Sequence, residues 1–208
     1  MIKTALYSKV INYDFESLFK KKGYAYFTNG AYNLNIIGVR ASGVNITNSF
    51  DDILLLIYKT PNGSWTRQVY QITTDPGQSY MAKPCNFKGT AILVPGQYRG
   101  AYKIGLHKGK YKALCQNKPV KVYRDNNKNK VYDYDPNTID EGMFGINIHK
   151  AGTFSKRVDT WSAGCQVLAS ETEFKAFMNY CDKQIKYGHG DTFTYTLLKE
   201  EDLIWIFI

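Results

Sequence analysis

The sequence is poor in cysteine, and its cysteines are widely separated. Cys85, Cys115, Cys165 and Cys181 share none of the close spacings that a disulfide scaffold or a structural zinc site requires. Three of them are expected to be small buried residues, with Cys181 on the apolar face of a helix. We expect no metal and no cofactor, and Cys165 alone has neighbours that suggest chemistry.

Long apolar runs are also missing. The strongest candidate, residues 53–58, has the length of a strand and falls far short of the ~20 residues that a membrane-spanning helix needs. The first ten residues do not show the order typical of a signal peptide, which is a basic region, a long apolar run and then small residues for cleavage. The sequence therefore predicts a protein that is made in the cytoplasm without a signal peptide and is not inserted in a membrane.

Acidic residues are fewer than basic ones, 18 against 27, which gives a formal net charge of +9. A basic surface attracts polyanions, and both nucleic acid and the anionic polymers of a bacterial wall qualify. No zinc-finger spacing and no aromatic RNA-binding signature occurs, so we expect no nucleic-acid partner. The lysines at 20–22 are interpreted as a solvated helix end.

Tyrosine and glycine are abundant, with 17 of each, and the pattern favours strands and turns. We predict a mainly β (β-rich α+β) fold, with residues 1–75 continuous with a core of residues 76–208. The expected helices cover residues 13–22 and a longer segment from Ser170 to about residue 186, with an apolar stripe at Phe174, Phe177, Cys181 and Ile185. The expected strands lie at 24–26 and 32–36 (a hairpin around Asn29-Gly30), 35–40, 53–58, 65–72, near Tyr80, and at 89–94, 101–106, 120–124, 144–149, 192–198 and 203–208.

One short region combines a thiol with an imidazole. His149 ends a segment in which Ile146 and Ile148 alternate with polar residues, and Cys165 follows Gly164 after a polar loop. A cysteine becomes a strong nucleophile as a thiolate, and a nearby imidazole is the usual means of deprotonating it. Gly164 permits a sharp turn that could direct the amides of residues 164 and 165 at an oxyanion.

This region resembles the catalytic motif of the L,D-transpeptidase family, in which a histidine precedes a Ser-x-Gly-Cys sequence. Here the match is His149 with Ser162-Ala163-Gly164-Cys165, and weaker similarity extends to Lys88-Gly89-Thr90 and Pro95-Gly96-Gln97-Tyr98. Three positions depart from the family pattern. Many members have His or Asn in place of Ala163, most have Arg or Asn in place of Gln166, and the residue after the histidine is usually Gly in place of Lys150. Residues 32–198 also resemble proteins encoded by tailed phages of gut bacteria. The resemblance implies a bent β-sheet or sandwich with one packed C-terminal helix and one short N-terminal helix.

The remaining site residues are expected around this pair. Asn147, Asp159 or a backbone carbonyl could hold the tautomer of His149. Ser162 could bind substrate or His149, or tie the turn, and Trp161 could form a pocket wall or pack beneath the pocket. By resemblance, Tyr98 and Arg99 lie in a loop that presents groups to the substrate. For His107, the end of a hairpin is favoured over a place in the site.

A second motif, Asp125-x-Asn127-x-Asn129, resembles the start of a calcium loop. Its sixth position is Lys130 in place of glycine, and its twelfth is Pro136 in place of an acidic residue. These departures favour a degenerate polar loop over a working calcium site.

The resulting expectation is a phage-encoded, cysteine-dependent enzyme that cleaves or transfers peptidoglycan stem peptides through a thioacyl-enzyme, with hydrolysis favoured. It would act at the bacterial cell wall (periplasm) after lysis-linked release or as part of a virion. The alternative is a non-enzymatic virion or surface component that retains the fold.

Overall fold

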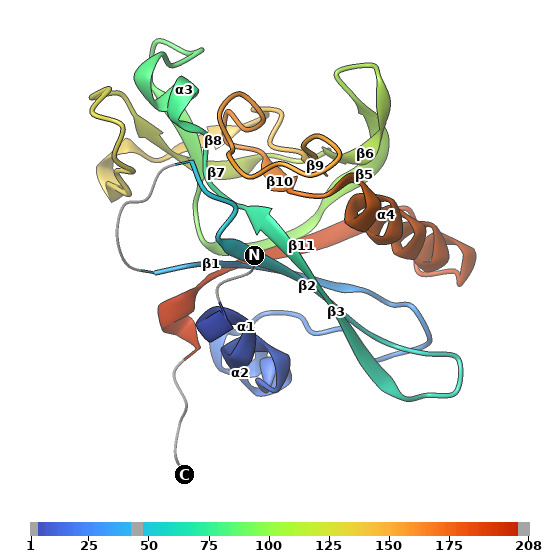
Figure 1. Ribbon diagram of the computed structural model, residues 1–208. Coiled ribbons are helices and arrows are strands. Elements are labelled where there is room, and N and C mark those ends of the chain that lie inside the picture. Colours follow the sequence, from blue (N-terminus) through green and yellow to red (C-terminus); the bar gives the residue numbers. More distant parts are fainter. Residues whose placement is uncertain (1–3, 43–47, 204–208) are drawn as a thin grey trace.

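The computed structural model describes residues 4–42 and 48–203, and its centre is a closed β-barrel (Figure 1). The barrel strands run in the order β1-β11-β5-β6-β9-β10-β3-β2. Their bounds are β1 Asn35–Arg40, β2 Asp52–Lys59, β3 Trp65–Thr73, β5 Gly96–His107, β6 Tyr111–Gln116, β9 Ile148–Lys150, β10 Gln166–Leu168 and β11 Thr192–Lys199. Strands from residues 1–75 and from residues 76–208 therefore share one barrel.

Strand β2 shows why the barrel has two cores. Its apolar run alternates between Leu54 and Leu56, which face the interior cluster, and Ile53 and Leu55, which face a second cluster outside. Helices α1 (Thr4–Ile11) and α2 (Phe15–Lys22) cover that outer face, as Figure 1 shows. Each such side chain, buried on either face, contributes ~1.5–3 kcal/mol, which explains an uninterrupted apolar run in a strand.

Both predicted helices form, and their ends follow from capping. In α2, Asp14 accepts a hydrogen bond from the Ser17 amide, and Gly23 ends the helix in the left-handed region. Helix α4 (Glu171–Lys186) begins at Ser170, whose side chain accepts from the Glu173 amide. Its buried stripe packs on the interior cluster of the barrel, but Ile185, expected there, is 39% exposed near the helix end.

A small three-stranded sheet lies beside the barrel. It contains β4 (Thr90–Leu93), β7 (Val120–Asp125) and β8 (Asp140–Gly142), in the order β4-β7-β8. The remaining elements are α3 (Gln78–Ala82) and two 3-10 turns, η1 (Pro136–Thr138) and η2 (Glu200–Asp202). Within the described residues, no helix combines the length and apolar character needed to cross a bilayer.

The β-rich α+β class is confirmed, with 38% strand and 22% helix. Several local predictions are wrong. No hairpin forms around Asn29-Gly30; residues 24–30 contain no strand, and a Cβ at Gly30 would lie 2.7 Å from the His189 ring. Tyr80 lies in helix α3, and strand β5 begins at Gly96, so the loop predicted there is already paired with β11.

Other departures concern number and extent. Two short N-terminal helices are present where one was expected, and strand β6 was not predicted. Strand β9 covers only the end of the extended segment predicted at 144–149. Most of the strand predicted at 203–208 lies outside the described residues, and Leu203 is not in a strand.

Candidate active site

Cys165 and His149 belong to two short parallel strands that pair with each other, or lie directly beside them. Strand β10 pairs with β9 so that Val167 lies opposite His149 and Gln166 opposite Ile148. Cys165 precedes β10 by one residue, and its side chain therefore lies on the same face as that of His149. The sulfur contacts the backbone that leads into β9, since the Asn147 amide donates to Sγ at 3.5 Å and Sγ donates to the Gly145 carbonyl at 3.3 Å.

The turn before Cys165 is built from Ser162 and Gly164. Gly164 has φ +124°, and a Cβ there would lie 2.4 Å from the carbonyl oxygen of Ala91, so only glycine fits. The fully buried Ser162 hydroxyl donates to the Cys165 carbonyl at 2.8 Å and accepts from the Gly164 amide at 3.1 Å. Ser162 therefore ties the turn. Within the described chain, the Cys165 amide has no acceptor, which leaves it as the available oxyanion donor.

His149 is held in one tautomer by backbone. Its ring is 2% exposed, and Nδ1 lies 2.8 Å from the carbonyl oxygen of Lys150, which can only accept a hydrogen bond. The proton of the neutral ring must therefore be on Nδ1, and Nε2 keeps a lone pair. The Tyr111 hydroxyl supports the same carbonyl at 3.3 Å and lies 3.2 Å from Nδ1. Asn147, Asp159 and a backbone carbonyl were the three groups expected to hold this tautomer, and the backbone carbonyl is the one that contacts Nδ1.

A second imidazole, that of His107, stacks on the first. The ring centroids of His107 and His149 are 3.9 Å apart, with planes 21° from parallel. Asn147 fixes the tautomer of His107: its Oδ1 accepts from the Gln116 amide at 2.8 Å, so its Nδ2 must donate to His107 Nδ1 at 3.0 Å. The hairpin end predicted for His107 is correct, but the ring belongs to the site. We call His107, Tyr111, Asn147 and His149 the imidazole cluster.

Burial keeps both reacting groups neutral. It lowers the pKa of His149 to about 3, with a further contribution from neighbouring His107. Burial likewise raises the pKa of the Cys165 thiol to about 11, although the Asn147 amide and Lys108 oppose this. At neutral pH Cys165 is therefore a thiol and His149 a neutral imidazole, so this arrangement does not hold a preformed thiolate.

The side chain next to Cys165 points the opposite way, into the barrel. Gln166 is fully buried and accepts from the Tyr195 hydroxyl at 2.8 Å, while its Nε2 donates to the Thr74 carbonyl at 3.3 Å. Thr74 in turn accepts from Arg40 and donates to Asp52, and Arg40 pairs with Asp75 at 3.0 Å. We call Arg40, Asp52, Thr74, Asp75 and Gln166 the acid network.

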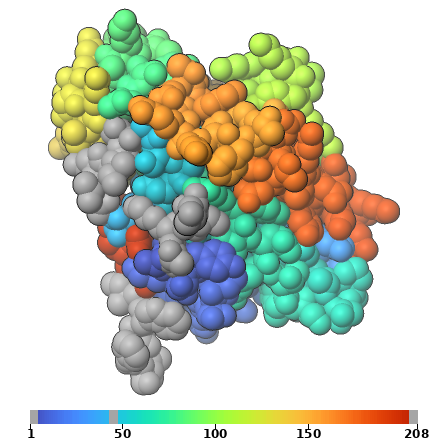
Figure 2. Space-filling view, viewed as in Figure 1, coloured from blue at the N-terminus to red at the C-terminus, as the bar shows by residue number. Residues whose placement is uncertain are grey.

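Two residues predicted near the pair lie in other contacts. The carboxylate of Asp159 accepts from Asn48 Nδ2 at 2.6 Å and lies 3.5 Å from Arg157, so it does not orient His149. Trp161 is 43% exposed on the loop of residues 151–165, which lies on the molecular surface in Figure 2, and its ring lies near Gly152.

Tyr98 and Arg99, predicted to bind substrate, belong to strand β5 and make other contacts. The Tyr98 hydroxyl donates to the carbonyls of Val94 and Lys121. The Arg99 guanidinium lies 6.0 Å from the Phe27 ring and lines a different hollow, together with His189. The glycine-rich loop that the resemblance implies is instead paired backbone.

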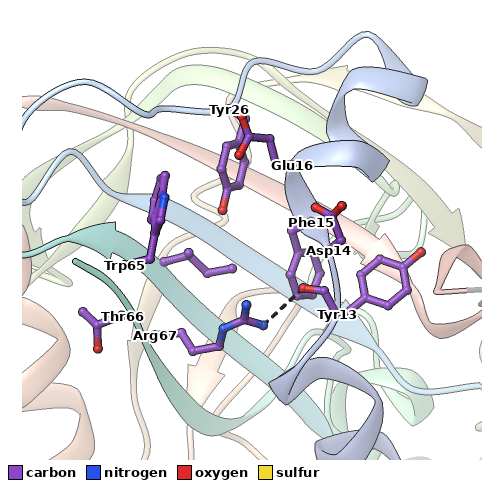
Figure 3. Close-up of a pocket in the computed structure, with 9 residues that line it drawn as sticks. Tyr13, Asp14, Phe15, Glu16, Tyr26, Trp65, Thr66 and Arg67 are labelled. Atoms are coloured by element: carbon purple, nitrogen blue, oxygen red, sulfur yellow. Dashed lines mark hydrogen bonds between the residues drawn. The ribbon is translucent and has the colours of Figure 1, made fainter. Parts of the chain in front are cut away.

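A hollow of about 320 Å³ opens beside the nucleophile turn. Ala163 lines it together with Tyr80, Cys85, Arg124 and Phe144. A larger hollow of about 480 Å³ lies on the side of α2, where Figure 3 shows Tyr26, Trp65 and Arg67 around it and a hydrogen bond from Arg67 to the Tyr13 carbonyl. The smaller hollow touches the turn before Cys165 through Ala163, whereas the larger one is lined by residues of other elements.

Comparison of the chain with protein-family models, with curated proteins and with solved structures finds no match.

His107 and Tyr111 are the site residues that the sequence interpretation missed. Both belong to the β5–β6 hairpin, in which His107 lies opposite Tyr111 across the turn at Lys108-Gly109. The turn was recognised, but the alternation of Tyr111, Ala113 and Cys115 after it was not. That alternation predicts a strand, and it would have placed Tyr111 beside His107.

Proposed function

We propose that the chain is a cysteine-dependent acyl-transfer enzyme that acts on peptidoglycan stem peptides. Cys165 Sγ attacks an amide carbonyl while His149 Nε2 accepts the thiol proton. The C–N bond then breaks, and the leaving amine takes that proton from His149. Water resolves the resulting thioacyl-enzyme and releases a carboxylic acid, so the net reaction is hydrolysis; an amine acceptor would give transpeptidation instead.

The observation that carries the proposal is the tautomer of His149. The Lys150 carbonyl, 2.8 Å from Nδ1, leaves Nε2 as the free base of a ring on the same face as Cys165. A general base needs one free lone pair within reach of its proton donor. The Cys165 amide, free of partners within the described residues, supports the same interpretation because it can donate to an oxyanion.

The substrate class rests on the motif resemblance and on charge. Stem peptides carry carboxylates, and a chain with a net charge of +9 favours their approach. The hollow beside Ala163 contains Arg124, but its guanidinium already pairs with Asp140 at 3.2 Å. Hydrolysis is preferred over transfer because the resemblance to proteins of tailed phages favours wall cleavage over wall building.

A non-enzymatic virion or surface component is the second candidate. The observation that favours it is the protonated state of Cys165, whose pKa is raised by burial to about 11. For such a component, the imidazole cluster would be a structural hydrogen-bonded unit.

The decisive experiment incubates purified peptidoglycan with the wild type and with Cys165→Ala and identifies the products by mass spectrometry. Shortened or un-crosslinked stems made only by the wild type support hydrolysis, and new cross-links support transfer. Cys115→Ala is a matched control, because Cys115 is a partly buried thiol whose pKa is raised by burial. It should leave the products unchanged. Identical product profiles from wild type and Cys165→Ala would remove the enzyme proposal.

A further inference from the structure

The loop after β7 contains a buried carboxylate oxygen without a partner. Asp125 is 3% exposed, and its Oδ1 has no hydrogen-bond partner among the described residues. Its other oxygen, Oδ2, accepts from the Asp133 amide at 2.9 Å, which directs the carboxylate into the loop of residues 125–133. Leaving a buried charged oxygen unsatisfied is costly, so such an atom indicates a missing ligand.

The groups around Asp125 do not supply a positive charge. Asp133 adds a second carboxylate to the loop, where it accepts a hydrogen bond from Asn127 Nδ2. Lys128 and Lys130 are exposed on the outside of the loop. The site therefore concentrates negative charge in its interior, although the protein as a whole is basic.

Oxygen-bearing groups recur at every second position of this loop. Asp125, Asn127, Asn129 and Asp133 occupy its first, third, fifth and ninth positions, and the seventh, Val131, has a backbone carbonyl. Asn127 contacts both Asn129 and Asp133, since its Oδ1 accepts from the Asn129 amide at 3.0 Å and its Nδ2 donates to the Asp133 carboxylate. Carboxylate, amide and carbonyl oxygens at these positions are the ligands of a hard divalent cation.

The sixth position was the main sequence objection to a cation site. Calcium loops use glycine there because the backbone must turn sharply. Lys130 nevertheless has φ +66°, and Lys128, at the fourth position, has φ +61°. Lysine at position 130 therefore does not prevent the turn, although it costs some backbone strain.

We propose that residues 125–133 bind a calcium ion through the carboxylates of Asp125 and Asp133, the side-chain oxygens of Asn127 and Asn129, and the Val131 carbonyl. In the described chain, no three His, Cys, Asp or Glu side chains are arranged to hold a metal, so this site depends on its neutral oxygens. With two carboxylates, the affinity falls at the weak end of the calcium range, with Kd roughly 10⁻⁴–10⁻³ M. Water completes the coordination, because the twelfth position, Pro136, has no side-chain oxygen.

The test measures binding of calcium itself to the full chain by isothermal titration calorimetry, and of terbium by luminescence with calcium as competitor. Asn129→Ala should weaken calcium binding at least tenfold. Asn126→Ala is the matched control, because Asn126 is an exposed asparagine of the same loop whose side chain points to the Phe87 carbonyl. It should leave the affinity unchanged.

Asp125→Asn, which keeps the shape of the buried side chain, should abolish saturable binding. A second variant guards against misfolding, since Asn129 is exposed and its replacement leaves the core intact. The proposal is overturned if the wild type shows no saturable calcium or terbium signal up to roughly ten times the expected Kd, or if Asn129→Ala and Asn126→Ala bind equally. Cys165→Ala should bind calcium as the wild type does, which separates this result from the proposed acyl-transfer activity.

Discussion

Cys165 and Gln166 are adjacent in the chain, yet they enter two polar clusters of opposite character. The imidazole cluster beside Cys165 consists of neutral groups whose tautomers are fixed by single hydrogen bonds, and His149 Nε2 is left unbonded within the described chain. The acid network beneath Gln166 contains a buried arginine and two buried carboxylates joined through Thr74. One cluster leaves a basic atom available, whereas in the other nearly every polar atom is bonded.

The difference indicates a division of tasks across the start of β10. Thr74, at the centre of the acid network, is fully buried, and its carbonyl accepts a hydrogen bond from Gln166. The backbone next to Cys165 is therefore fixed from inside the barrel. The imidazole cluster then only orients the two histidine rings. Variants of the imidazole cluster should accordingly change activity, whereas variants of the acid network should change the free energy of unfolding.

The largest effect is expected on the imidazole side. His149→Gln removes the proposed general base and, if the proposed function holds, should lower the rate of peptidoglycan cleavage by roughly 10²–10⁴-fold, with little change in the melting temperature. Asp159→Asn is the control, because that carboxylate contacts Asn48 and not His149, and its rate should equal that of the wild type. If both variants lose activity equally, the backbone-held tautomer is not what makes His149 a base.

On the acid side, Arg40→Met should destabilise the fold by about 3–5 kcal/mol, because it leaves the Asp75 carboxylate buried without its cation. Arg157→Met is the matched control. Its side chain is 67% exposed and pairs with Asp159 at 3.5 Å, so the loss should be about 0–1 kcal/mol. Urea denaturation measures both, and equal midpoints would show that the acid network is not a source of stability.

The smallest effect is a pH dependence of stability. Burial, then Asp75 and Asp51, raise the pKa of Asp52 from 3.8 to about 8. A folded pKa above the unfolded value means that the contribution of this group to stability is complete below about pH 4 and is lost as pH rises toward 8. Asp52→Asn should flatten that slope, whatever its effect on absolute stability, whereas Asp191→Asn, at an exposed site, should not. If the free energy of unfolding of Asp52→Asn depended on pH as strongly as that of the wild type, a group other than Asp52 would be responsible for the dependence.

Much of the fold could be predicted because local signals and tertiary context agree. The apolar run at 53–58 and the Ser170 cap each determine an element without help from distant residues. The predicted hairpin at Asn29-Gly30 is not formed. Gly30 lies instead against His189, 159 residues away, a contact that no local pattern predicts.

The site divides in the same way. Cys165, His149, Ser162 and Gly164 could be predicted as one group because they match a single short motif. The group that orients His149 was not, because any residue has a carbonyl, and only coordinates show that the one at Lys150 lies 2.8 Å from Nδ1. The place of His107 could be predicted only if strand β6 had been recognised. Strand β6 pairs with β5, which contains His107, and also with β9, which contains His149.

Strands β9 and β10 contain only three residues each and depend on longer neighbours, with β9 held by β6 and β10 by β3. The thiol and the imidazole are close in sequence, but no excised peptide spanning both would keep them aligned, because their alignment comes from closure of the whole sheet. Any attempt to transplant this pair to a smaller scaffold must therefore carry the flanking strands with it.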